Sequence, residues 1–214
     1  ETCPAVGHAF ENTRDTPMAQ LNPPSAESKS TSVTATTRSS RGLTFRRHFS
    51  SAERAPFDEI VWERRQSAIT NPDGSIVFKM TGAEIPSAWS QLATDILVSK
   101  YFRKAGVGED KSHGETSVRQ VVTRIARTLR KAGEKQGGYF ATSEDARVFE
   151  EELTWLLVNQ VGAFNSPVWF NCGLFEEYGI TGQGGGYAYD MKTDRVFETT
   201  SAYENPQCSA CFIQ

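Results

Sequence analysis

Apolar residues recur at spacings of three and four positions in three stretches of the chain, and this period predicts three amphipathic helices. The predicted helices cover residues 87–106, 117–133 and 142–161, with Gly106 and Gly133 ending the first two. Each range opens on a residue whose side-chain oxygen can cap a helix, namely Ser87, Ser117 and Thr142. Ser117 and Thr142 have Gln120 and Asp145 three positions later, which is the spacing of a capping box. We interpret the apolar stripes as packing faces.

Alternating apolar and polar positions predict a β-hairpin on each side of the helical region. Residues 67–69 and 75–80 flank the turn sequence Asn-Pro-Asp-Gly. Residues 187–189 and 195–197 flank the sequence Met-Lys-Thr-Asp in the same way. A further short strand is predicted at residues 59–63.

The first 55 residues carry scattered Pro, Ser and Thr with few large apolar side chains. Because they cannot bury enough surface to offset the entropy of ordering, we interpret residues 1–55 as a disordered tail and residues 56–214 as the folded part. Met18 could be the native start, which would make the preceding residues an artefact. Residues 28–51 contain four arginines and no acid, a composition that suits a solvated tail and also a transit peptide or basic arm.

Net charge, apolar segments and cysteine count limit the kinds of partner and the cellular compartment that the sequence suggests. The formal net charge of −3 gives no argument for nucleic acid or a membrane surface as a partner. No stretch approaches the roughly 18 apolar residues that a membrane span needs, and the first residues lack the apolar segment of a secretory signal. The four cysteines are too few and too unevenly spread for a secreted disulfide framework. We therefore expect a soluble, cytoplasmic protein with reduced thiols.

Basic side chains gather on the polar side of the second predicted helix. This face could meet a phosphate or another anionic group, although a solvated surface is the simpler interpretation. The residues concerned are Arg119, Arg124, Arg127, Arg130 and Lys131.

Cys208 and Cys211 form a Cys-x-x-Cys pair, a spacing shared by zinc half-sites and thiol–disulfide catalysts. Zinc needs further ligands, and Cys172 and the three scattered histidines offer no matching pair. The apolar residues 212–213 follow directly, which predicts a buried strand and not the helix start of a thioredoxin-like site. Spacing alone leaves zinc binding, redox chemistry and two small buried thiols open.

The sequence Asn-Ser-Pro at residues 165–167 follows the third predicted helix. A rigid turn fixed by the proline could hold the Ser166 hydroxyl and exposed N–H groups toward an anion. The same three residues are also typical of a turn that ends a helix, and spacing alone favours that interpretation.

From about residue 57 to residue 214 the chain resembles the N-terminal part of the class II, adenosylcobalamin-dependent ribonucleotide reductases. The resemblance rests on several short sequence motifs that contain uncommon residues. Among them are Ala-Phe-Asn-Ser-Pro-Val-Trp-Phe-Asn and Pro-Gln-Cys-Ser-Ala-Cys-Phe-Ile. The matching blocks are residues 89–95, 99–106, 117–120, 159–160, 163–171 and 206–213.

The resemblance implies an α/β protein with a ten-stranded α/β barrel behind a helical N-terminal region. This chain, itself α+β, would hold that helical region, the two hairpins and the first barrel strand. Cys211 would lie on that strand and be catalytic, as one member of a redox-active pair. Ser166, Ala210 and Cys211 would bind the substrate. Cys208 is not the catalytic partner in this pattern, and Cys172 stands where an aliphatic residue is expected, which we interpret as a packing substitution.

The implied reaction converts ribonucleotides to 2′-deoxyribonucleotides, with adenosylcobalamin as the cofactor that starts the radical chemistry. A thiyl radical removes the ribose 3′ hydrogen, and a dithiol supplies the two electrons needed for loss of the 2′ hydroxyl. A thioredoxin-type reductant then reopens the resulting disulfide. A nucleotide effector is a further implied partner, and a homodimer is left open. The radical cysteine, the second redox cysteine and most of the cobalamin surface would follow Gln214, so we expect an inactive fragment.

Two alternatives belong to other classes of protein. One is a zinc- or thiol-based interaction module that uses Cys172, Cys208 and Cys211. The other is the large subunit of an iron-dependent class I reductase, which would share the barrel and Cys211 but not the sequence motif of residues 163–171.

Overall fold

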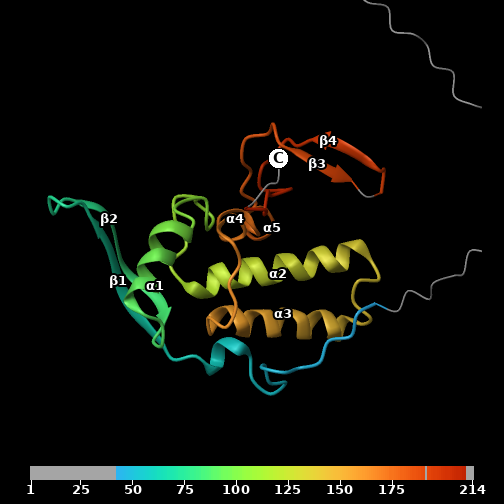
Figure 1. Ribbon diagram of the computed structural model, residues 1–214, viewed down its shortest axis with the longest axis horizontal. Helices are drawn as coiled ribbons and strands as arrows, with labels where there is room; N and C mark the ends of the chain where they lie inside the picture. Colours follow the sequence, from blue (N-terminus) through green and yellow to red (C-terminus); the bar gives the residue numbers. More distant parts are fainter. Residues whose placement is uncertain (1–41, 191, 211–214) are drawn as a thin grey trace, which may run out of the picture. The chain divides into compact units, whose positions relative to one another are not determined.

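The computed structural model describes residues 42–190 and 192–210, and these residues form an α+β structure, as predicted for this chain (Figure 1). None of the helices in these residues is long and apolar enough to cross a membrane. The elements in chain order are a 3-10 turn η1 (Pro56–Glu59), strands β1 (Trp62–Thr70) and β2 (Ile76–Pro86), helix α1 (Gln91–Ile96), a π-helical turn η2 (Leu97–Tyr101), helices α2 (Val118–Gln136), α3 (Ser143–Val158), α4 (Ser166–Asn171) and α5 (Leu174–Tyr178), and strands β3 (Tyr187–Asp190) and β4 (Arg195–Glu198).

Helices α2 and α3 lie side by side and antiparallel at the centre of this arrangement (Figure 1). The predicted capping box is confirmed, since the Ser117 and Gln120 side chains each bond a backbone N–H at the start of α2. The predicted end at Gly133 is wrong, because α2 continues to Gly137, whose φ of 72° ends it. Gly133 is instead a packing position: an added Cβ would lie 2.6 Å from the Phe140 ring.

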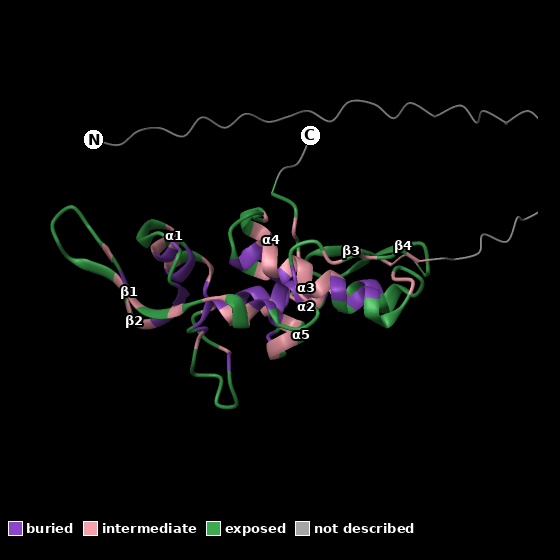
Figure 2. Ribbon diagram, turned by 90° about the horizontal axis from the view of Figure 1, so that it is seen from below, coloured by how far each residue is buried: buried purple, intermediate pink, exposed green. Residues whose placement is uncertain are grey.

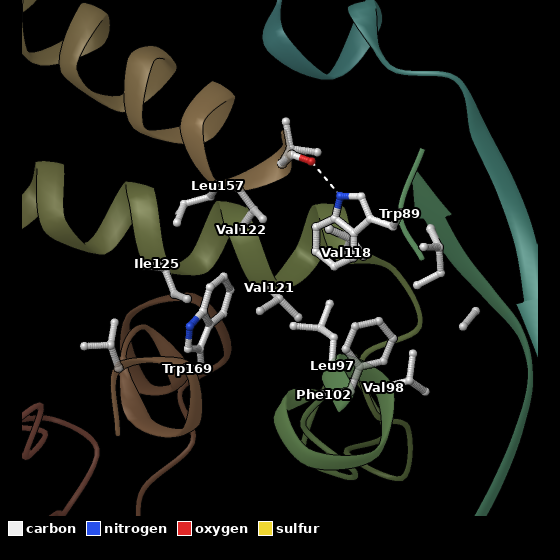
Figure 3. Close-up of a cluster of buried hydrophobic side chains, with 14 of the residues drawn as sticks. Trp89, Leu97, Val98, Phe102, Val118, Val121, Val122, Ile125, Leu157 and Trp169 are labelled. Carbon is white, nitrogen blue, oxygen red and sulfur yellow. Dashed lines mark hydrogen bonds between the residues drawn. The ribbon is translucent and has the colours of Figure 1, made fainter. Parts of the chain in front are cut away.

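The apolar stripe of α2 forms one wall of the core, and five of its residues have no exposed surface: Val118, Val121, Val122, Ile125 and Ala126. Two tryptophans from other elements close against this wall (Figure 3). Trp89 donates its indole N–H to the carbonyl of Val158 over 2.7 Å and so caps the end of α3. Figure 2 shows the buried residues concentrated on and around α2, whereas the tip of β1–β2 and the β3–β4 pair are exposed.

Both predicted hairpins are present as antiparallel two-stranded sheets. The β1–β2 hairpin is longer than predicted, running from Trp62 to Pro86, with an irregularity in the register between Arg65 and Ser67. The separate strand predicted at residues 59–63 is wrong in its first half. Residues 56–59 form the turn η1, because Pro56 at its start favours helical φ and cannot donate to a sheet ladder.

The first predicted helix starts later than its pattern suggested. Ser90, and not Ser87, is the cap, since its hydroxyl accepts the Ala93 N–H over 3.1 Å. Ser87 lies in the turn after β2, where its N–H donates to the carbonyl of Val61 over 2.8 Å. The helical stretch ends with the π-helical turn η2 at Tyr101, five residues before Gly106.

Residues 42–55 lie along α3, so the disorder predicted for residues 1–55 is wrong for this segment. The Phe45 N–H donates to the Asp145 carboxylate over 2.7 Å, and the Phe49 ring stacks on Trp155 with centroids 4.8 Å apart. Ser50 donates its hydroxyl to Glu152 over 2.6 Å. The rest of the predicted tail, residues 1–41, falls outside the described residues.

Replacing the observed cap should destabilise the protein more than replacing the predicted one. We expect Ser90→Ala to lower the free energy of unfolding by about 1 kcal/mol, because the Ala93 N–H loses its partner. Ser87→Ala, at another exposed serine three residues earlier, should change it by less than about 0.5 kcal/mol. Urea unfolding of the chain followed by circular dichroism measures both variants, and equal losses would contradict the assignment of the cap.

Candidate functional site

Ser166 is the first residue of α4, so the Asn-Ser-Pro sequence opens a short helix where a turn was predicted. Pro167 favours this outcome because its fixed φ suits a first helical turn and its missing N–H has no partner to lose there. Ser166 is exposed, and its hydroxyl lies 2.9 Å from the hydroxyl of Tyr101 at the end of η2. The hydroxyl therefore faces solvent with one protein partner.

Arg124 fixes α4 from the protein interior. It belongs to α2, and its guanidinium donates to the carbonyls of Trp169 and Cys172 over 2.7 and 2.6 Å. It also pairs with the Glu115 carboxylate over 2.7 Å. Arg124 is 1% exposed, so its predicted place on a solvated polar face is wrong. The last carbonyls of α4 are thus held by a buried charge on the central helix.

Glu115 receives donors from several parts of the chain at once. Besides Arg124, it accepts the Arg103 N–H over 2.8 Å and the Tyr178 hydroxyl over 2.9 Å. Burial, with the nearby Glu115 charge second, raises the pKa of Tyr178, so this hydroxyl remains a donor at neutral pH. The carboxylate thereby joins the segment before α2, the end of η2 and the end of α5.

The other basic residues of α2 face carboxylates. Arg127 and Lys131 both pair with Glu177, over 2.9 and 3.0 Å, and Arg130 pairs with Glu150 over 3.0 Å. Arg119 lies over the Trp62 ring, 3.9 Å from its centroid, and 3.3 Å from the Glu84 carboxylate. Because Arg119, Arg127, Arg130 and Lys131 already face carboxylates, these four side chains offer little to a phosphate.

The segment before Cys211 is held at the other end of α4. Asn171, the last residue of α4, donates its side-chain amide to the carbonyl of Gln207 over 2.9 Å. Residues 206–210 have no regular secondary structure, so the buried strand predicted here is not formed by the described residues. A strand needs a neighbour to pair its backbone, and none of the described strands pairs with this segment. Ala210 is exposed, and Cys211 falls outside the described residues.

Cys172 is 3% exposed and packs in the core directly after α4, as its interpretation as a packing residue requires. Cys208 is half-buried and packs against the same cluster. The neighbouring Cys208 thiol, together with burial, raises the pKa of Cys172, and the neighbouring Cys172 thiol lowers the pKa of Cys208 to about 7. Apart from a cysteine at each position, nothing in the sequence indicates that these two side chains are neighbours.

Two hollows flank η2 and α4. One, of about 290 Å³, is apolar and is lined by residues that include Trp89, Tyr101, Phe164 and Trp169. The other, of about 650 Å³, is lined by residues that include Tyr101, Lys100, Arg103, Asn171 and Tyr203. Among residues 42–190 and 192–210, no three or more His, Cys, Asp or Glu side chains gather where they could hold a metal ion.

Residues 63–160 match the family model described as class II vitamin B12-dependent ribonucleotide reductase. The matched region belongs to this family. Curated relatives from several bacteria carry the name vitamin B12-dependent ribonucleotide reductase. That of Rhodopirellula baltica is 42% identical over 174 residues, covering 81% of this chain and 16% of the relative.

The relative in Bradyrhizobium diazoefficiens is 40% identical over 200 residues, covering 79% of this chain and 16% of its own length. In Streptomyces clavuligerus the identity is 46% over 143 residues, with 66% of this chain and 14% of the relative covered. The chain therefore spans about a sixth of the length of these reductases. The family resemblance inferred from the sequence words is confirmed.

In this member of the reductase family, replacing the buried arginine should destabilise the protein strongly, and replacing an exposed arginine should destabilise it only slightly. We expect Arg124→Met to lower the free energy of unfolding by about 3–5 kcal/mol, because it leaves the Glu115 charge buried without its partner. Arg127→Met, on the same helix but with a side chain 42% exposed, should cost at most about 1 kcal/mol. Denaturant unfolding of the chain compares the two, and a similar small loss in both would show that the buried pair is not a structural anchor.

Proposed function

We propose that this chain supplies part of the substrate site of an adenosylcobalamin-dependent ribonucleotide reductase, which converts ribonucleotides to 2′-deoxyribonucleotides. The observation that carries the proposal is that α4 holds both candidate substrate elements. Ser166 is its first residue, and its last residue, Asn171, bonds the backbone of the segment that leads to Cys211.

The geometry of α4 supports this assignment. Six helical residues rise about 1.5 Å each, so the two ends of α4 are about 7.5 Å apart along its axis. A nucleotide spans such a distance, and an exposed hydroxyl at one end with a thiol-bearing segment at the other could touch different parts of one ligand. Because Arg124 holds α4 from behind, the spacing between these elements is set before substrate arrives.

Cys211 is the proposed catalytic thiol, and Ser166, Ala210 and Cys211 are the proposed substrate-binding residues. Loss of the ribose 2′ hydroxyl as water takes up two electrons and two protons. A dithiol that includes Cys211 would supply them and become a disulfide, and a thioredoxin-type dithiol would reduce that disulfide for the next cycle. The Ser166 hydroxyl would bind and orient the substrate without exchanging electrons.

Adenosylcobalamin supplies the radical chemistry when it is bound to such enzymes. The two hollows beside α4 do not fit this cofactor. The hollows of about 290 and 650 Å³ beside α4 have the size of sites for drug-sized ligands, and a corrin ring with its nucleotide tail is larger. We therefore assign no cobalamin contact to the residues that line these two hollows.

Loss of the Ser166 hydroxyl should weaken substrate binding. In the complete reductase, Ser166→Ala should raise KM for the ribonucleotide roughly 3- to 10-fold, which corresponds to one hydrogen bond. Ser87→Ala, at an exposed serine far along the chain from α4, is the matched control and should leave KM unchanged. Steady-state kinetics at several substrate concentrations provide the measurement. An unchanged KM in Ser166→Ala would remove this residue from the substrate site.

The two cysteines of the Cys-x-x-Cys pair should differ in their effect on turnover. In the complete reductase, Cys211→Ser should abolish multiple turnover with a thioredoxin-type reductant, because the active-site dithiol cannot be regenerated. Cys208→Ser should be much milder. Deoxynucleotide formed per enzyme over many cycles is the measurement, and equal losses in both variants would contradict the assignment of Cys211.

A further inference from the structure

Two thiols that no part of the proposed reaction uses meet at the end of α4. Cys172 follows the last residue of the helix and is buried in the core. Cys208 approaches from a segment far along the chain and packs against the same core. The residue before it, Gln207, accepts a hydrogen bond from Asn171, the residue before Cys172. Two cysteines brought to one cluster in this way can form a disulfide when their Cβ atoms come within roughly 4 Å of each other.

Backbone contacts on both sides hold the thiols together. Arg124 donates to the carbonyl of Cys172 over 2.6 Å, and Cys172 N–H donates to the carbonyl of Val168 over 3.0 Å. On the other side, Asn171 fixes the carbonyl of Gln207, the neighbour of Cys208, over 2.9 Å. The groups that hold the two cysteines therefore belong to α4 and to Arg124, which fixes α4. These contacts keep the sulfur atoms close as the protein fluctuates.

The two thiols differ in exposure and in acidity, as a reactive cysteine and its resolving partner do. Cys208 is half-buried, and the neighbouring Cys172 thiol lowers its pKa to about 7. Cys172 is 3% exposed, and the neighbouring Cys208 together with burial raises its pKa, so it stays protonated. Within residues 42–190 and 192–210, the groups that shift these pKa values are the two thiols themselves and Arg124, whose charge acts in the opposite direction on Cys172.

We propose that Cys172 and Cys208 form a redox-active dithiol, separate from the catalytic one, which a hydroperoxide oxidises to an intramolecular disulfide. The Cys208 thiolate attacks the O–O bond of hydrogen peroxide and becomes a sulfenic acid, and the hydroxide released takes up a proton to leave as water. The Cys172 sulfur then displaces the sulfenic hydroxyl, which leaves with the Cys172 proton as a second water. Two thiols and one peroxide thus give one disulfide and two waters.

The disulfide would tie the segment before Cys211 covalently to the end of α4, next to the existing Asn171–Gln207 contact. An external dithiol would reverse the reaction by becoming a disulfide itself as the two cysteines regain their protons. The inference uses Cys172 and Cys208 alone and does not depend on the substrate assignment of Ser166 or Cys211.

The test uses the 214-residue chain with Cys3→Ser and Cys211→Ser, which leaves only the two thiols in question. After treatment with hydrogen peroxide, titratable thiols should fall from two to none while the chain remains monomeric. Trypsin cuts after Arg147, Lys192 and Arg195, so Cys172 and Cys208 lie in different peptides. Mass spectrometry should find these two peptides joined, and a dithiol reductant should separate them.

Single replacements in the same background assign the roles. With Cys172→Ala, Cys208 should be trapped as a sulfenic acid by dimedone, and its reaction with peroxide at pH 7 should slow roughly tenfold as its pKa returns toward about 8.5. The half-maximal rate should accordingly move from about pH 7 upward, a shift that a purely structural cysteine would not cause. With Cys208→Ser, the buried Cys172 should stay a free thiol under the same treatment.

Circular dichroism confirms that each variant is folded before the comparison. The proposal is overturned if peroxide joins only cysteines of different chains, or if Cys208 is oxidised while Cys172 stays titratable in the two-cysteine chain. It is also overturned if the pH dependence of Cys208 oxidation is the same with and without Cys172. None of these outcomes bears on substrate turnover, so the reductase assignment can fail or hold separately.

Discussion

The ion pair between Arg124 and Glu115 joins more of this structure than any apolar contact described above. Both side chains are almost fully buried, 1% and 0% exposed, and an isolated charge in such a place would cost several kcal/mol. The pair is tolerated because its hydrogen-bonding capacity is used: the guanidinium reaches the carbonyls of α4, and the carboxylate accepts from Tyr178 and the backbone of Arg103. A polar network of this kind specifies one arrangement of the elements it joins, since a shifted helix would leave donors and acceptors unpaired.

This constraint explains how a helix of six residues can be a rigid part of the molecule. Such a helix is too short to be stable alone, and its proline-led start supplies few hydrogen bonds. Arg124 satisfies two of its last carbonyls, and Trp169 buries its ring against α2 (Figure 3). The backbone of Gly173, which follows Cys172, lies close to the backbone of Arg124. An added Cβ on Gly173 would collide with the Arg124 carbonyl, and the φ of Gly173 is 82°. The position of Ser166 is thus determined from the interior of the protein.

The features that the sequence predicted correctly are those decided by neighbours in the chain. The Ser117–Gln120 box and the Thr142 cap each depend on residues within one helical turn, and both hairpins depend on short alternating runs around a turn. The cap predicted at Ser87 is wrong because two serines three positions apart offer the same chemistry; the Ser87 N–H bonds the carbonyl of Val61, and Ser90 caps the helix.

The features that the sequence did not predict depend on residues far apart in the chain. Nothing near Arg124 marks it as buried, because its partners lie at positions 115, 169 and 172 and meet only after folding. The helix α4 was missed for a related reason: its three apolar or aromatic residues are too few to show a period, and its stability comes from α2. In the candidate site, the exposed Ser166 hydroxyl could be predicted from the Asn-Ser-Pro motif. The proximity of Cys172 and Cys208 could not, because it arises only when the chain folds.

The other end of α4 constrains the chain near Cys208. Asn171, the last residue of the helix, bonds the carbonyl of Gln207, the residue before Cys208. Cys208 packs against the core cluster that contains Cys172 and Trp169. Because Arg124 holds the carbonyls of Trp169 and Cys172, the anchor that positions Ser166 at the start of α4 also supports the contacts of residues 207–208 at its end.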